Sequence, residues 1–236
     1  MPKFNCRKII TSYDGTFIQS SHFHDSITRM YFYDCEFFLL REYEKDFFLN
    51  IGISPKKIKL LPLGVKSELF KIKRQYPVKY DKSIYLGKID DRKRQYIFQN
   101  KNLSIDFVGP NASSRFDEKD PSYLGVWSQD EKYNNLTEYG NLVLLSVSEN
   151  GNPPLVCLEA MSAGLGIVIS EASNEMLDNN LKFITVIPED KIYDKNFLNK
   201  AIEENRKYSI ANRDEIIAYS KQRSWSEVAK IYNNYL

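Results

Sequence analysis

The chain has 236 residues, enough for one large domain or two small ones. Apolar residues make up 42% of it and aromatic residues 14%, which is ample for a packed core, and 33 basic against 31 acidic residues give a formal net charge of +2. That balance provides no basic face for nucleic acid, so we predict that nucleic acid is not a partner.

The sequence also bears on the compartment. No apolar run approaches the length of a membrane span, and residues 1–8 lack a signal-peptide core. Cys6, Cys35 and Cys157 are odd in number, widely spaced and without a CxxC pair. They are typical of reduced thiols, which predicts a cytoplasmic protein. We see no convincing metal-ligand cluster and predict neither a metal nor a cofactor.

Residues 1–62 contain only a few apolar runs. They give two or three strand–helix units, which are too few for an independent open sheet of usual size. Residues 64–82 are polar and irregular, include Pro77, and predict a linker. The predicted strands of this part cover residues 8–12, 35–40 and 58–62, and the predicted helices cover residues 22–33 and 41–50.

From residue 83 to residue 187 strands alternate with helices. Such alternation predicts an α/β fold with a doubly wound parallel sheet, which binds ligands at the carboxyl ends of its strands. Three further helical patterns follow. The predicted strands cover 83–87, 103–108, 122–124, 142–145 and 167–169, and the predicted helices 92–99, 129–139, 154–164, 195–207, 211–221 and 226–236.

Residues 148–164 are the most informative segment. A polar loop runs into a short helix, with Pro154 suited to its first turn and Gly164 to its end. The free N–H groups at that helix start favour an anion. Glu159, about one turn further, is a carboxylate that would accept hydrogen bonds from two neighbouring hydroxyls, as on a ribose. This pattern favours a nucleotide diphosphate; from the spacing alone, an equal alternative is a Glu159 that only stabilises the positive end of the helix.

Six short motifs occur in an order that resembles the retaining, two-Rossmann-domain glycosyltransferases of the large family four (glycosyl transferases group 1). Each motif is weak alone, and the shared order makes the resemblance strong over roughly residues 30–236. The segments are 57–70, similar to "kixvipnGvdxxxF"; 85–93, similar to "yvGRLxxxKg"; 107–109; 123–125; 146–164, similar to "SxxEgxplvlLEAMaxG"; and 225–232.

The resemblance implies a GT-B-like fold. Residues 73–236 would form a Rossmann-like domain that binds a nucleotide-sugar donor. Residues 1–72 would form a truncated N-terminal α/β portion on the acceptor side, with a linker, and the final helix would pack back on it. The implied reaction is retaining hexosyl transfer to a saccharide or lipid-linked saccharide, without a metal. A peripheral membrane contact, a homo-oligomer and a partner chain stay open.

The resemblance also assigns roles to residues. Lys88 and Lys93 would hold the diphosphate and stabilise it as a leaving group, and Glu149 would lie against the donor sugar. Lys88 keeps the charge of the arginine more common there but lacks its fork of donors. Glu159 would bind the ribose, and Gly87 would let the backbone approach the phosphates. The other implied donor-binding residues are Asn150, Gly151, Asn152, Pro153, Pro154 and Leu155.

Two other functions stay open. The short N-terminal part is compatible with a nucleotide-sugar binding module that has no activity of its own, or with a subunit completed by a partner chain. A nucleotide-sugar epimerase with two Rossmann folds would need acid and base residues from a full first domain, and none stands out.

Overall fold

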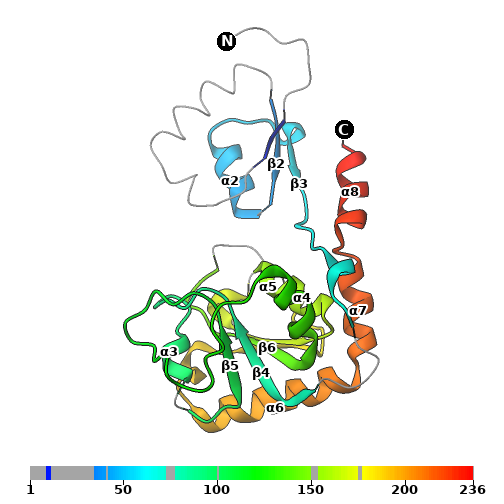
Figure 1. Cartoon of the computed structure of the whole chain (residues 1–236). Coiled ribbons are helices and arrows are strands. Elements are labelled where there is room, and N and C mark those ends of the chain that lie inside the picture. Colours follow the sequence, from blue (N-terminus) through cyan, green and yellow to red (C-terminus); the bar gives the residue numbers. More distant parts are fainter. Residues whose placement is uncertain are drawn as a thin grey trace.

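The computed structural model describes residues 9–11, 35–40, 42–72, 78–99, 101–149, 154–174 and 177–235. They form two parallel sheets (Figure 1). The first sheet has the order β1-β2-β3 and the second has the order β5-β4-β6-β7-β8. Their bounds are β1 (Ile9–Thr11), β2 (Glu36–Leu39), β3 (Ile58–Leu60), β4 (Lys79–Leu86), β5 (Ile105–Val108), β6 (Tyr139–Leu144), β7 (Gly166–Ser170) and β8 (Ile184–Ile187).

The five-stranded sheet is doubly wound, and each of its strand pairs is parallel. After β4 the chain adds β5 on one side, then crosses back and adds β6 on the other side of β4. The order of strands therefore reverses between β4 and β6. In open α/β sheets ligands bind at this switch point, in the crevice outside the carboxyl ends of the strands.

Helices cover the sheets and connect their strands. Helix α6 packs across β4, β6, β7 and β8, while α5 packs on β6, β7 and α7. The helices are α2 (Glu42–Asn50), α3 (Gln95–Phe98), α4 (Gln129–Asn135), α5 (Leu155–Ser162), α6 (Lys195–Ala211), α7 (Arg213–Lys221) and α8 (Trp225–Asn233), with 3-10 turns η2 (Pro55–Lys57), η3 (Ser67–Leu69), η4 (Leu136–Glu138), η5 (Glu171–Ser173) and η6 (Glu189–Lys191).

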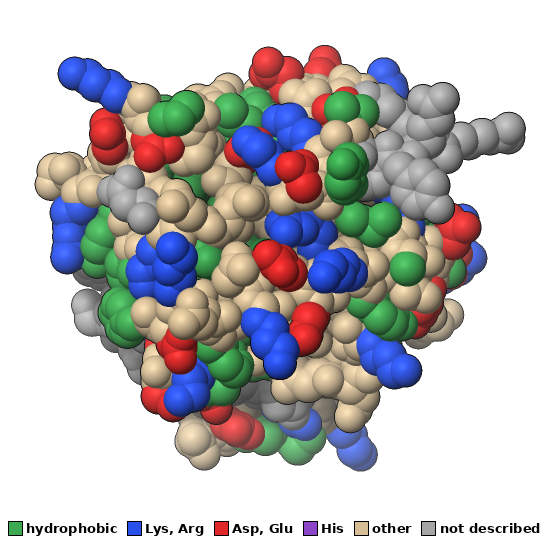
Figure 2. All heavy atoms as spheres, turned by 90° about the horizontal axis from the view of Figure 1, so that it is seen from below, with side chains coloured by type: hydrophobic (Ala, Val, Ile, Leu, Met, Phe, Trp, Pro, Cys, Tyr) green, Lys and Arg blue, Asp and Glu red, His purple; other side chains and the backbone are tan. Residues whose placement is uncertain are grey.

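The main core lies in the five-stranded sheet. Strands β6 and β7 are buried along their whole length, as expected for parallel strands covered on both faces. A separate small core lies under the first sheet, where the rings of Phe37 and Phe48 have centroids 4.7 Å apart. On the face seen from below in Figure 1, basic and acidic side chains are interspersed rather than gathered by sign (Figure 2).

The C-terminal segment meets the linker and the first sheet. The backbone N–H of Val65 donates to the carbonyl of Arg223 at 2.8 Å, and the N–H of Trp225 donates to the carbonyl of Val65 at 3.1 Å. Beyond this crossing, Tyr232 of α8 packs edge-on against Phe38 of β2, with ring centroids 6.1 Å apart. Helix α8 therefore contacts the N-terminal sheet (Figure 1).

Most predicted elements are confirmed with shifted ends, and three predictions need correction. Strand β4 begins at Lys79, inside the predicted linker, because Lys79 pairs with Tyr139, with a shift of register between Lys79 and Ser83. Helix α3 begins only at Gln95, since Arg94 has a left-handed φ of 59°. Residues 122–124 form a single bridge, from Tyr123 to Phe107, and not a strand. Strand β8 was not predicted, and the predicted helix 22–33 lies outside the described residues.

Among the described residues, no helix has both the length and the apolar character that a membrane crossing requires.

Candidate functional site

The candidate site lies at the switch point between β4 and β6. The loop after β4 carries Lys88, Arg92 and Lys93, and the loop after β6 carries Ser146 and Glu149. The two loops are joined by a backbone hydrogen bond in which the N–H of Val147 donates to the carbonyl of Arg92 at 2.9 Å. Charged side chains far apart in the sequence are thus brought to the carboxyl edge of the sheet.

Lys93 and Glu149 form a buried ion pair. The Nζ of Lys93 lies 2.8 Å from Oε1 of Glu149, and the side chains are only 10% and 9% exposed. Burial at this level limits screening by water and salt, so each charge depends on the other. Two of the residues to which the resemblance gives catalytic roles therefore touch in the structure.

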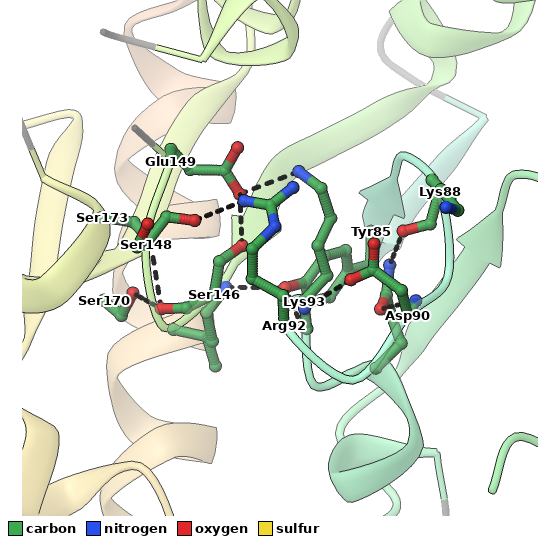
Figure 3. A network of polar contacts seen from close by, with 12 residues as sticks. Tyr85, Lys88, Asp90, Arg92, Lys93, Ser146, Ser148, Glu149, Ser170 and Ser173 are labelled. Atoms are coloured by element: carbon green, nitrogen blue, oxygen red, sulfur yellow. Dashed lines mark hydrogen bonds and ion pairs between the residues drawn. The ribbon is translucent and has the colours of Figure 1, made fainter. Parts of the chain in front are cut away.

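A second cation shares the same carboxylate. An Nη1 atom of Arg92 lies 3.3 Å from Oε1 of Glu149 and also donates a hydrogen bond to the carbonyl of Ser148. Figure 3 shows the Arg92 and Lys93 side chains converging on Glu149. Two positive charges against one negative charge leave a net positive charge at this edge, which favours an anionic ligand.

Tyr85 fixes the loop after β4 relative to the loop after β6. Its hydroxyl, at the end of β4, donates to the backbone carbonyl of Lys93 and accepts from the N–H of Leu145 at 3.0 Å. The side chain is completely buried, and this burial raises the pKa of the phenol. A neutral tyrosine thus joins the backbone that carries Lys93 to the end of β6.

Serine side chains hold the loop of Glu149. The hydroxyl of Ser146 donates to Oε1 of Glu149 at 2.5 Å. The carbonyl of Ser146 accepts from Ser170 at 2.6 Å and from Ser173 at 3.0 Å (Figure 3). Glu149 is therefore oriented by donors on both loops, and its place is set by several short contacts.

Two glycines permit the close approach of the loops after β4 and β5. Gly87 has a φ of +150° and Gly109 a φ of +144°, a region that other residues rarely adopt. A Cβ at Gly109 would lie 2.0 Å from the carbonyl oxygen of Gly87, a distance that no side chain tolerates. A Cβ at Gly87 would lie 3.6 Å from the Lys93 side chain, an ordinary contact, and the predicted role of Gly87 toward phosphates stays a prediction.

Helix α5 begins next to this cluster. The prediction that Pro154 lies in the first turn is off by one position: Pro154 is buried and is the N-cap residue, and Leu155 opens the helix with an exposed side chain. Cys157, in the first turn, is fully buried, which raises the pKa of its thiol; the charge of Glu149 adds to the rise and that of Lys93 opposes it. The expected contacts of Asn150, Gly151, Asn152 and Pro153 lie outside the described residues.

Glu159 has a partner that the sequence did not indicate. Oε1 of Glu159 lies 2.5 Å from the Nζ of Lys132 in α4, with side chains 19% and 14% exposed. The predicted ribose-binding carboxylate thus lies at a contact between two helices and is not free in solvent. Its role toward a ribose stays a prediction.

Lys88 differs from the other two predicted catalytic residues. It is exposed, and its backbone carbonyl accepts from the side chain of Gln95 at 3.0 Å. In Figure 3 its side chain lies away from Glu149. The structure therefore brings Lys93 and Glu149 together and leaves Lys88 at the outer side of the same loop.

Three polar residues of this region were missed or undervalued in the sequence: Tyr85, Arg92 and Lys132. Arg92 sits in a charged run that is typical of a solvated face, and Lys132 is one of several charges on a short helix. Only contacts between distant segments distinguish them. Within the described ranges, no group of three His, Cys, Asp or Glu side chains is arranged to hold a metal ion, and independence from metals stays a prediction.

Comparison with known proteins bears on the fold. No protein-family model matches the chain, and no curated protein does. Among solved structures, HepE from Anabaena, in complex with UDP and glucose, aligns with a TM-score of 0.65 and 16% identity, over 97% of this chain and 70% of HepE. The lipopolysaccharide outer core galactosyltransferase WaaB aligns with 0.64 and 16%, over 98% and 75%.

Sucrose-phosphate synthase from Thermosynechococcus elongatus aligns with a TM-score of 0.65 and 15% identity, over 98% of this chain and 67% of the synthase. Identities this low show likeness of fold alone. The predicted GT-B-like α/β fold is thereby confirmed.

Proposed function

We propose that the chain is a glycosyltransferase that moves a sugar from a nucleotide-diphosphate sugar to a saccharide or lipid-linked saccharide acceptor, with retention at the anomeric carbon. The observation that carries the proposal is the buried Lys93–Glu149 pair, with Arg92 beside it, at the switch point of a GT-B-like sheet. HepE, which shares the fold, has been solved with UDP and with UDP-glucose, which supports a nucleotide-sugar donor.

The chemistry requires positive charge at this place. When the bond between the anomeric carbon and the phosphate oxygen breaks, negative charge develops on the departing diphosphate. Lys93, Lys88 at the outer side of the same loop and the N–H groups at the start of α5 would stabilise that charge. The acceptor oxygen then forms the new bond to the anomeric carbon, and its proton passes to the departing phosphate oxygen. Because these lysines and N–H groups would stabilise the leaving diphosphate without a metal, we expect a chelator to leave turnover unchanged.

The carboxylates have different roles in the proposal. Glu149, oriented by Lys93 and Ser146, would lie against the donor sugar, while Glu159 would accept hydrogen bonds from the ribose hydroxyls. The segment around Pro154 would lie beside the bound diphosphate.

Binding of nucleotide diphosphates tests the site. Calorimetric titration with UDP, ADP and GDP should show that Glu159→Ala lowers the affinity for the best-binding nucleotide by roughly ten- to a hundredfold. This is the effect of losing hydrogen bonds to a charged group. Glu204→Ala, which removes an exposed carboxylate of α6, is the control and should leave affinity unchanged. Equal affinity in wild type and Glu159→Ala would refute the assignment.

Turnover tests the enzymatic part. Mass spectrometry of the purified protein with nucleotide-sugar donors should detect slow release of the nucleotide diphosphate, and faster release with a suitable acceptor. Clear turnover eliminates an inactive binding module. Donor binding without any turnover would instead favour the module or a subunit completed by a partner chain.

A further inference from the structure

Lys132 and Glu159 form a contact between α4 and α5 that the proposed reaction has not used. The two side chains meet at 2.5 Å and are largely shielded from solvent, at 14% and 19% exposure. Exposed ion pairs contribute little because water and salt screen them, but shielding makes this pair more sensitive to geometry. Lys132 thereby sets the direction in which the Glu159 carboxylate points.

Helix α4 is itself fixed, so Lys132 is presented from a defined position. Ser128 caps the helix in a reciprocal capping box with Glu131. On the next residue, the ring of Tyr133 packs edge-on against Phe70 of the linker, with centroids 5.1 Å apart. Lys132 therefore lies between a capped helix start and an aromatic contact, and its ammonium reaches Glu159 from an anchored backbone.

A carboxylate that recognises a diol must hold its oxygens in one plane and one direction. A lysine on Oε1 leaves acceptor sites on both oxygens for neighbouring hydroxyls, since an ionised carboxylate has about four lone-pair sites. Without the lysine, no ion pair would hold the Glu159 side chain in this one of its staggered rotamers. The lysine would then determine selectivity for the diol and not merely the stability of the fold.

We propose that Lys132 is a positioning residue that orients Glu159 toward the two adjacent hydroxyls of a ribose, and so sets the preference for ribonucleotides over 2′-deoxyribonucleotides. This inference rests on the proposed function. It assigns Lys132 no contact with the ligand itself.

The experiment compares two affinities for each variant. Calorimetry gives the dissociation constants of UDP, ADP and GDP and of their 2′-deoxy forms, and the best-binding base is used throughout. Wild type should prefer the ribo form by about tenfold, the effect of one charge-assisted hydrogen bond. In Lys132→Met and Lys132→Gln this preference should fall to about twofold or less. Lys132→Arg, which keeps a cation at the site, should restore most of it.

Lys200→Met is the matched control, because it removes an exposed lysine of α6 from a surface ion pair. It should keep the wild-type preference. If Lys132 had only a structural or a general electrostatic role, its loss would weaken binding of the ribo and 2′-deoxy forms by the same factor. An unchanged ratio of the two affinities in both Lys132 variants therefore overturns the inference. Circular dichroism confirms folding of each variant, and if Lys132→Met does not fold, Lys132→Gln decides.

Glu159→Gln separates the two levels of the argument. If Glu159→Gln abolishes the preference while the Lys132 variants retain it, the inference about Lys132 fails and the proposed site stands. If Glu159→Gln also retains it, or if wild type binds none of the nucleotides, both are overturned.

Discussion

The Lys93 ammonium lies 2.8 Å from the Glu149 carboxylate, and the two residues are 56 positions apart in the sequence. One comes from the loop after β4 and the other from the loop after β6, so the contact spans the point where the strand order reverses. The buried pair therefore lies at the position where a doubly wound sheet binds its ligand. It also couples the stability of the domain to the groups proposed for catalysis.

The first prediction concerns this pair. Lys93→Met should lower the free energy of unfolding by about 3–5 kcal/mol, because it leaves the Glu149 charge buried without its main partner. The double variant Lys93→Met, Glu149→Gln should regain much of that loss but should not regain affinity for nucleotide diphosphates. Urea unfolding and calorimetry measure the two effects.

The control for the first prediction is Lys230→Met, which breaks an exposed pair with Glu227 in α8. We expect it to change stability by no more than about 1 kcal/mol. A Lys93→Met protein as stable as this control would show that the Lys93–Glu149 pair is not buried as described.

The second prediction concerns Tyr85. Tyr85→Phe removes the hydroxyl that bridges Lys93 and Leu145, leaving a buried carbonyl and a buried N–H without this partner. It should cost about 1–3 kcal/mol of stability and weaken nucleotide binding through the displaced Lys93 backbone. Tyr80→Phe, on the same strand but 64% exposed, should do neither. Equal behaviour of the two variants would contradict the bridging role.

These contacts show how far the sequence leads and where it stops. Apolar runs such as residues 142–145 and 167–169 predict buried parallel strands. A parallel strand is covered on both faces, so its side chains are apolar at every position and do not alternate with polar ones. The order of motifs placed Lys93 and Glu149 in one site. Their direct pairing depends on the switch point, which no local pattern reveals. The same holds for Lys132, whose partner Glu159 lies 27 positions away on another helix.

The predicted ends of helices and strands were wrong where tertiary contacts outweighed the local preference of the sequence. Lys79 lies in a polar stretch typical of a linker, yet it extends β4 because its Nζ binds the buried Asp106 at 3.2 Å and the Tyr139 hydroxyl at 2.8 Å. Residues 122–124 have the apolar content of a strand, but only Tyr123 bridges to β5. Strand β8 has only four residues, follows the turn at Asp178-Asn179-Asn180 and completes the sheet beside β7.

The third prediction concerns the close approach of the two glycines. Gly109→Ala should destabilise the protein by more than about 3 kcal/mol, because backbone strain of about 1–3 kcal/mol adds to a clash with the Gly87 carbonyl. Gly125→Ala is the matched control: its φ is +76° but no atom lies within 4 Å of the added Cβ. It should cost about 1–2 kcal/mol, the left-handed strain alone. Thermal unfolding compares them, and a Gly109 variant no worse than the Gly125 variant would contradict the packing.

The fourth prediction concerns pH. Burial raises the pKa of the Cys157 thiol, whereas an exposed thiol titrates near about 8.5. In the unfolded chain the thiol loses its proton first, so the stability that the neutral thiol contributes is complete below about pH 8.5 and is lost as the pH rises above it. Between pH 8 and 10 the unfolding free energy should therefore fall less steeply for Cys157→Ala than for wild type, by up to about 1.4 kcal/mol per pH unit. Parallel curves would contradict it.

The most direct measurement is a crystal structure of the protein with UDP, ADP or GDP bound. The account predicts a diphosphate at the carboxyl ends of β4 and β6, within hydrogen-bond reach of the Lys93 ammonium, and a ribose beside Glu159. A nucleotide seated elsewhere, for example in the cavity of about 700 Å³ between η3, α7 and α8, would contradict it.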